Sequence, residues 1–188
     1  RQEQVFETMG AVQRLWRGEA FSGTNGVGQA ASVKIFPRPV QRELPVWVTV
    51  AGNPKNFERA GSSGAHLLTH LLDQDETVLA SRIALYRDAR AAAGFDPATG
   101  IVSLMIHTLV GEDADVVREQ ARGPYCNYIK ANIGLFRGLA QSRGRDVDLS
   151  SMSPATLDEF VNFLYDRFAA SRGLIGTPES CAPLVSRL

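Results

Sequence analysis

The segment Val46-Trp47-Val48-Thr49-Val50, followed by Ala51-Gly52-Asn53-Pro54, decides the fold class of this chain. Its first part is an almost continuous apolar run of β-type residues, which is typical of a strand buried on both faces. Its second part breaks the strand, and Asn53-Pro54 predicts the start of a helix over residues 54–62. A buried strand that leads directly into a helix indicates an α/β fold with a parallel sheet.

The same alternation of strand and helix repeats towards the C-terminus. The pattern predicts two more strands and three more helices, at 65–70 and 101–110 and at 74–93, 113–128 and 154–171. Because parallel strands need cover on both faces, crossover helices fit this pattern. Three strands are few for a doubly wound domain, but the alternation is also typical of half a (β/α)8 barrel.

The residues before this repeat differ in character. Residues 2–17 carry apolar side chains at the three-and-four spacing of a helix, and Gly18 marks its end. Residues 18–45 are rich in Gly and Pro, which predicts a surface excursion with a short strand pair. We expect residues 1–188 to form one domain that carries this excursion. Because the chain begins at Arg1 rather than Met, we also expect it to be a piece of a longer protein.

The composition argues against several classes of function. The chain has 20 Lys and Arg residues against 20 Asp and Glu residues, and nucleic-acid binding needs a basic face. No apolar run approaches the roughly 20 residues that span a bilayer. The two cysteines, Cys126 and Cys181, cannot make a disulfide framework, which predicts a cytoplasmic protein. The three histidines lack the spacing of metal ligands, so we predict no metal site.

Four segments carry a resemblance to a known family. Pro45–Pro54, with the following Phe57–Ala65, resembles the fifth strand and helix of the bacterial-luciferase-like flavin monooxygenases. Three further segments agree with that family in order and spacing, namely Gln13–Gly18, Phe36–Gln41 and Gly176–Glu179. Gly26, His70 and the segment Val102–Thr108 resemble a subgroup of this family that is found inside or beside natural-product assembly lines.

The resemblance covers most of the chain and implies the C-terminal part of a (β/α)8 TIM barrel. Strands five to seven would be present with their helices, and the first four strands and the eighth would be missing. The implied activity is that of a monooxygenase, which uses reduced FMN and dioxygen to oxidise a small organic or carrier-protein-bound substrate. A separate flavin reductase would supply the reduced FMN. Family members often pair through barrel helices, so a homodimer is a further expected state.

Two alternatives stand beside this function. One is a related barrel oxidoreductase that uses a deazaflavin or FMN for hydride transfer. The other is a non-catalytic truncated barrel that acts as a binding or assembly module. We expect at most weak FMN binding by this part of the barrel alone, because the flavin ring of the family rests partly on the missing half.

Candidate cofactor-binding residues lie where strands end, because the carboxyl ends of strands form the active face of a (β/α)8 barrel. The helix start at Asn53 favours an anion, although Asn53 before Pro54 is by itself also a good helix cap. The resemblance assigns phosphate or ribityl contacts to Gly52, Asn53 and Asn56. It adds three residues at strand ends to the cofactor site, Ala51, Thr69 and His70.

Two histidines, His70 and His107, are the candidates for catalysis. The resemblance places His70 beside the flavin ring, and the alternative is a histidine satisfied by a neighbouring backbone carbonyl. His107 ranks below His70, because strand alternation leaves the direction of its side chain open. His66 begins a strand and is interpreted as structural. Cys126 is interpreted as a core residue rather than a nucleophile.

Overall fold

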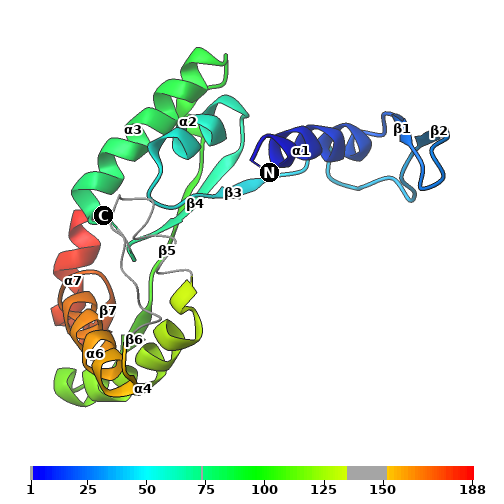
Figure 1. The fold of residues 1–188 in the computed structure, drawn as a ribbon. Coiled ribbons are helices and arrows are strands. Elements are labelled where there is room, and N and C mark those ends of the chain that lie inside the picture. The colour runs from blue at the N-terminus through cyan, green and yellow to red at the C-terminus, as the bar shows by residue number, and fades with distance from the viewer. Residues whose placement is uncertain (1, 73, 135–151) are drawn as a thin grey trace. The chain divides into compact units, whose positions relative to one another are not determined.

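The computed structural model describes residues 2–72, 74–134 and 152–188 (Figure 1). The chain divides into two compact units, Arg1–Trp47 and Val48–Leu188. The first unit begins with helix α1 (Gln2–Trp16), which confirms the predicted helix. The helix ends at Trp16, and the turn that follows includes Gly18, whose φ of 88° suits glycine because it has no Cβ.

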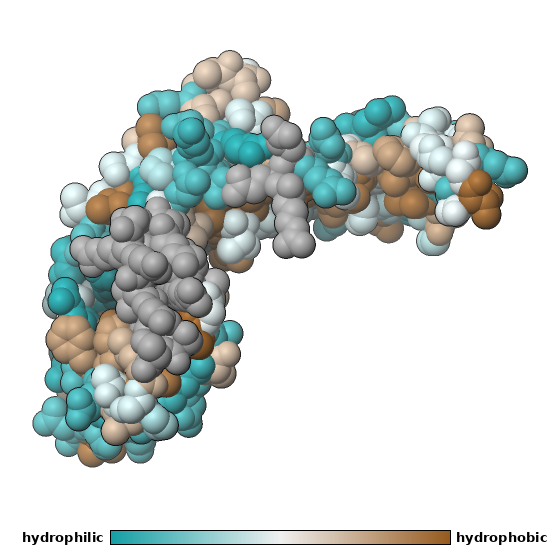
Figure 2. All heavy atoms as spheres, in the orientation of Figure 1, coloured by the Kyte–Doolittle hydropathy of each residue, from teal (hydrophilic) through white to brown (hydrophobic). Residues whose placement is uncertain are grey.

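The excursion of the first unit contains an antiparallel strand pair. Strands β1 (Phe21–Thr24) and β2 (Ala30–Val33) pair with Phe21 opposite Val33, and the side chain of Asn25 accepts hydrogen bonds from two backbone N–H groups of the turn. The indole N–H of Trp16 donates to the Gln41 carbonyl at 3.0 Å, which ties the helix to the end of the excursion. Figure 2 shows hydrophobic residues at the surface of this unit.

A sheet of three strands in the order β3-β4-β5 lies in the second unit, apart from Trp47, the first residue of β3. These are β3 (Trp47–Thr49), β4 (His66–His70) and β5 (Val102–Met105), and β4 pairs in parallel with β5. Helix α2 (Pro54–Ser62) connects β3 to β4, and helix α3 (Glu76–Ala92) with the short 3-10 helix η1 (Pro97–Thr99) connects β4 to β5. Both connections are therefore crossovers that contain a helix, as the sequence predicts.

The prediction of one long strand over 101–110 is wrong. The structure has β5, a break at Ile106-His107, and then a separate strand β6 (Thr108–Val110). Strand β6 pairs in parallel with β7 (Leu174–Gly176), with Thr108 opposite Leu174. The segment changes its hydrogen-bonding partner from β4 to β7 along its length, so the ladder is interrupted where the change occurs.

Strand β7 is absent from the sequence prediction. It has three residues and lies between Gly173 and a terminal Gly176, so it carries almost none of the apolar pattern from which strands are predicted. The sequence also led us to expect the last strand of the barrel to be missing. The structure instead has one more parallel strand after the last predicted helix.

Each of the remaining helices begins directly after a capping side chain. Helices α4 (Ala114–Ala131), α6 (Pro154–Ser171) and α7 (Pro178–Arg187) follow the N-caps Asp113, Ser153 and Thr177, and α3 follows Asp75. Each cap side chain accepts a hydrogen bond from a backbone N–H of the first turn. Helix α4 runs past the predicted end at 128, and the helix over 154–171 is confirmed.

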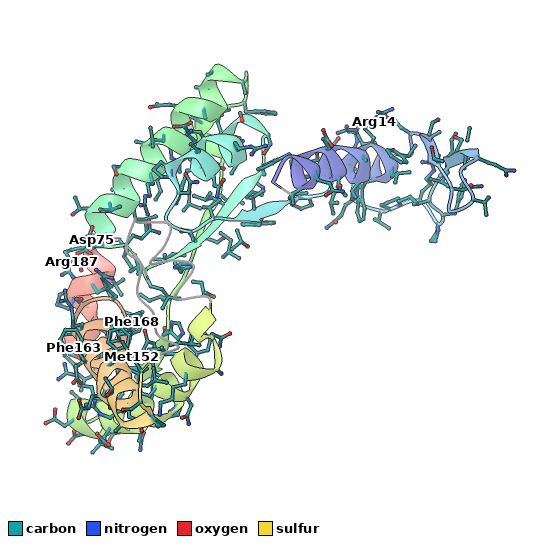
Figure 3. The ribbon with its side chains drawn as sticks, in the orientation of Figure 1. Arg14, Asp75, Met152, Phe163, Phe168 and Arg187 are labelled. Atoms are coloured by element: carbon teal, nitrogen blue, oxygen red, sulfur yellow. The ribbon has the colours of Figure 1, made fainter. Side chains whose placement is uncertain are left out.

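Two hydrophobic cores hold the second unit together. The first, called here the Phe57 core, joins α2, α3 and β4 and consists of Val50, Phe57, Ala60, Leu67, Leu71, Leu79, Tyr86 and Leu184. The second, called here the Tyr165 core, joins α4, α6 and β7 and consists of Val117, Tyr125, Cys126, Ile129, Val161, Tyr165, Phe168, Ala169 and Ile175. An ion pair of 2.6 Å between Arg187 of α7 and Glu76 also ties α7 to the start of α3, near the labelled Asp75 (Figure 3).

Candidate functional site

The loop after β3 lies beside the end of β4. The backbone N–H of Val50 donates to the Leu68 carbonyl at 2.9 Å. Ala51 and Gly52, the next two residues, therefore lie alongside Thr69 and His70. Ala51 and Gly52 are half-buried. The structure therefore brings the two predicted parts of the cofactor site, the start of α2 and the end of β4, to one edge of the sheet.

The start of α2 confirms that Asn53 is a helix cap. Its side-chain oxygen accepts the N–H of Lys55 at 3.1 Å, and its carbonyl accepts the N–H of Asn56 at 3.1 Å. Among the described residues, no hydrogen bond uses the backbone N–H of Gly52 or Asn53 or the side-chain amide of Asn56. Three donors are thus left at the positive end of the α2 helix dipole, which is the arrangement that binds an anion.

The side chain of Thr69 lies in the protein interior. Strand alternation puts Thr69, which is 1% exposed, on the same face of β4 as Leu67 of the Phe57 core. The side-chain amide of Gln74, itself 2% exposed, donates to the Thr69 hydroxyl at 3.0 Å and to the His70 carbonyl at 2.7 Å. The guanidinium of Arg82 donates to the other end of Gln74. Thr69 therefore helps to fix the end of β4, on the face opposite to the His70 side chain.

His70 lies on the half-buried face of β4, opposite Met105 of β5. Its Nδ1 accepts the backbone N–H of Leu72 at 3.3 Å. The neutral ring therefore carries its proton on Nε2, which makes that nitrogen a hydrogen-bond donor. The partner on Nδ1 is a backbone N–H, whereas the sequence alternative was a backbone carbonyl.

His107 lies in the break between β5 and β6, inside a cluster of aromatic rings. Its ring centroid is 5.4 Å from that of Tyr125, 5.6 Å from that of Tyr128 and 5.3 Å from that of Phe168, which Figure 3 labels on α6. Burial lowers the pKa of His107, and the nearby charge of His70 lowers it further. The ring is therefore neutral at neutral pH, and the two histidines lie close enough for their charges to interact.

His66 has the structural role that the sequence predicts. Its Nδ1 accepts the backbone N–H of Ile101 at 3.2 Å, which ties the start of β4 to the start of the next strand. Burial lowers the pKa of His66, and the charge of Arg90 adds to this. Arg90, itself 4% exposed, donates to the Ala65 carbonyl at 3.1 Å and to the Thr99 hydroxyl at 3.1 Å at the same end of the sheet.

Both cysteines are buried and free, and burial raises the pKa of the Cys126 thiol. The core interpretation of Cys126 is confirmed, because it lies in the Tyr165 core. Within the described ranges, no group of three or more His, Cys, Asp or Glu side chains gathers at metal-binding distances. In the same ranges, none of the helices combines the length and the apolar character that crossing a membrane requires.

Two features of the site escaped sequence analysis. Gln74 holds the end of β4, and its only signal is a polar residue in the short link between a strand and a helix. Tyr125 and Tyr128 surround His107, and their spacing of three residues on a predicted helix marks one helical face. That face could be recognised from the sequence, but the residue it packs against could not.

Comparisons with known proteins agree with this geometry. The sequence profile of the family described as "Luciferase-like monooxygenase" matches residues 1–187. A comparison with curated proteins returned no match.

Three solved structures share the fold with low sequence identity. The monooxygenase RslO1 from Streptomyces bottropensis aligns with a TM-score of 0.63 and 21% identity over 96% of this chain and 48% of its own. An F420-dependent secondary alcohol dehydrogenase, solved with an F420-acetone adduct, aligns with a TM-score of 0.66 and 19% identity over 100% of this chain and 52% of its own. The oxygenating constituent of 3,6-diketocamphane monooxygenase from Pseudomonas putida, solved with FMN, aligns with a TM-score of 0.61 and 15% identity over 99% of this chain and 53% of its own.

The chain spans about half the length of each of these structures. Its parallel strands and crossover helices thus form part of a luciferase-like barrel. Because the family profile covers nearly every residue, the chain belongs to the luciferase-like monooxygenase family.

Proposed function

We propose that the protein is a flavin-dependent monooxygenase, which uses reduced FMN and dioxygen to oxidise a small organic or carrier-bound substrate. The observation that carries this proposal is a set of donors at the start of α2, beside the end of β4, that no described residue uses. These donors are the N–H groups of Gly52 and Asn53 and the side-chain amide of Asn56. A flavin mononucleotide has a phosphate that matches such donors.

Each residue of the site has a definite task in this proposal. Gly52, Asn53 and Asn56 hold the phosphate, and Ala51 lies against the ribityl chain. His70 directs its Nε2–H donor at the flavin or the substrate, while Leu72 and Gln74 hold the end of its strand in place. When bound, the reduced flavin supplies the electrons for the reaction with dioxygen. A separate reductase delivers the flavin, and the compartment is the cytoplasm.

A deazaflavin-dependent oxidoreductase is the second candidate. The observation that favours it is the shared fold with an F420-dependent alcohol dehydrogenase, which covers the whole of this chain. A deazaflavin of that type also carries a phosphate, so the α2 donors suit either cofactor. The two candidates differ in their use of dioxygen, because the deazaflavin reaction is a hydride transfer.

Flavin titration of the protein at its native length tests the proposal. We expect FMN to bind at least about tenfold more tightly than riboflavin, because only FMN has the phosphate. Asn56→Asp should weaken FMN binding by about tenfold through charge repulsion and leave riboflavin binding unchanged. The matched control Asn127→Asp, at an exposed position of α4, should change neither affinity.

Two outcomes would count against the proposal. Equal affinity for FMN and riboflavin would show that the start of α2 does not bind the phosphate. Tight binding of F420 with no oxygen consumption in the presence of a reductase and FMN would favour the deazaflavin enzyme instead.

A further inference from the structure

A cavity of about 410 Å³ lies between α4 and the paired strands β6 and β7. Nine residues line it, namely His107, Thr108, Leu109, Gln120, Ala121, Pro124, Tyr125, Tyr128 and Ile175. The volume falls in the range of pockets that hold small organic molecules. None of the predicted cofactor residues at the start of α2 or the end of β4 lines this cavity.

The lining carries no Asp, Glu, Lys or Arg side chain. His107 adds no charge at neutral pH, because burial and the charge of His70 lower its pKa. Burial likewise raises the pKa of the Tyr125 phenol, so that group also stays neutral. A charged ligand would lose part of its hydration here without an opposite charge in the lining to compensate, which makes binding of an ion unfavourable.

The walls of the cavity favour a planar ligand. The rings of Tyr125 and Tyr128 have centroids 6.5 Å apart at an angle of 49°, and both lie within 6 Å of the His107 ring. Flat apolar groups gain from edge and face contacts with such rings beyond the area that they bury. Pro124, Leu109 and Ile175 supply the aliphatic remainder of the lining.

The ring nitrogens of His107 supply the polar contact. Its neighbours in the cluster are aromatic rings, and no described residue forms a hydrogen bond with either nitrogen. His107 is half-buried, so a ligand that carries one hydroxyl or carbonyl group can replace water at these nitrogens and form a hydrogen bond with the ring.

We propose that this cavity is a binding site for an uncharged aromatic molecule, which His107 holds through a single hydrogen bond. The site is separate from the proposed phosphate site, and its occupation does not require flavin. If the ligand is the substrate of the proposed reaction, its class is a neutral aromatic compound with a hydroxyl or carbonyl group.

The test uses three probes of similar size on the protein at native length and without flavin: phenol, toluene and benzoate. Binding is followed through the NMR signal of the His107 ring, which is assigned by its loss in His107→Phe. We expect phenol and toluene to bind, and benzoate to bind at least about tenfold more weakly than phenol. His107→Phe, followed by calorimetry, should weaken phenol binding by about three- to tenfold and leave toluene binding unchanged.

Two substitutions on the same helix separate the cavity from the surface. Ala121→Phe fills the cavity and should weaken phenol and toluene binding by at least about tenfold. Asn127→Phe places the same side chain at an exposed position of α4 and should change neither affinity. Thermal unfolding of both variants shows whether the fold is kept, and His107→Phe provides the answer if Ala121→Phe does not fold.

The inference is overturned if benzoate binds as well as phenol, if Ala121→Phe binds phenol like the wild type, or if phenol leaves the His107 signal unmoved. None of these results bears on FMN binding. Likewise, equal affinity for FMN and riboflavin would not change the conclusion drawn from phenol, toluene and benzoate.

Discussion

The end of β4 and the start of β6 hold the two candidate histidines in contrasting surroundings. At the end of β4, a network of hydrogen bonds joins His70, Thr69, Gln74 and Arg82 to the backbone. At the start of β6, His107 is surrounded by aromatic rings, with a cavity beside it and no described partner for its nitrogens. The first arrangement fixes geometry, and the second leaves room for a ligand.

This contrast assigns different tasks to the same residue type. A hydrogen-bonded histidine on a fixed strand end keeps one tautomer and one direction, which suits it for positioning a flavin or substrate. A neutral histidine in an apolar cavity recognises a polar group on an otherwise apolar molecule. The sequence analysis ranked His70 above His107 as a candidate for catalysis. That ranking does not reveal that the two side chains have different surroundings and suit different tasks.

The largest expected effect comes from removing the packing that supports the β4 side. Phe57 is 0% exposed at the centre of the Phe57 core, and Phe57→Ala should lower the free energy of unfolding by about 3–5 kcal/mol. Phe163→Ala is the matched control, because Phe163 is 55% exposed on α6 and its loss should cost less than about 1 kcal/mol. Urea denaturation of both variants checks this, and similar losses would contradict the burial difference.

The next effect concerns the hydrogen-bonded network. Gln74→Leu removes three buried or half-buried hydrogen bonds, to the Thr69 hydroxyl, to the His70 carbonyl and from the Arg82 guanidinium, so it should cost about 1–3 kcal/mol. Gln120→Leu makes the same change at the exposed rim of the cavity and should cost less than about 0.5 kcal/mol. Chemical denaturation gives both values. If Gln120→Leu proves the more costly, the contrast between the two regions is wrong.

A smaller effect separates the two roles of Asn53. Asn53→Ala should lower the free energy of unfolding by about 1 kcal/mol through loss of the cap on α2. Asn53→Asp keeps the cap, and should restore stability while weakening FMN binding through charge repulsion. Denaturation and FMN titration of both variants check this. An Asn53→Asp variant that binds FMN normally would leave Asn53 with its capping role only.

The smallest effect is a pH dependence of stability. The pKa of His107 is lowered in the folded protein, so below the unfolded-state pKa of about 6.5 the unfolded chain binds more protons. Its contribution to stability is therefore complete above pH 6.5 and falls as the pH decreases towards the folded-state pKa. His66 acts in the same direction, so the wild type should lose stability below about pH 6.5, and His107→Phe should lose less. Thermal unfolding between pH 5 and pH 8 checks the difference, and parallel curves for the two proteins would contradict it.

Much of the fold follows from local patterns that need no tertiary context. Asn53, Ser153 and Asp113 begin helices because a side-chain oxygen can accept a backbone N–H of the first turn, whatever packs around it. The apolar runs around Val48 and Leu67 became neighbouring strands because such runs are stable only when covered. The family was also recognisable from Pro45–Pro54 and the segments that agree with it.

Strand partners, by contrast, were decided by the tertiary structure. Residues 101–110 form a continuous β-type run, yet the run pairs with β4 at Val102 and with β7 at Thr108, and it breaks between them. Strand β7 itself is too short to show a pattern, and it exists because β6 offers it a hydrogen-bonding edge. Hydrogen bonds between strands join residues far apart in the chain, so no local signal contains them.

The sequence by itself thus determined helices α1, α2, α3, α4 and α6, the alternation of strand and helix, and the edge at which Ala51 and Gly52 lie beside the end of β4. Only the tertiary structure decided what each side chain contacts. Thr69 lies in the interior with Gln74, and His107 packs against aromatic rings of α4 and α6. The physical reason is that helix caps and apolar periodicity act within a few residues, whereas burial, pKa and ligand space depend on what other segments bring into contact.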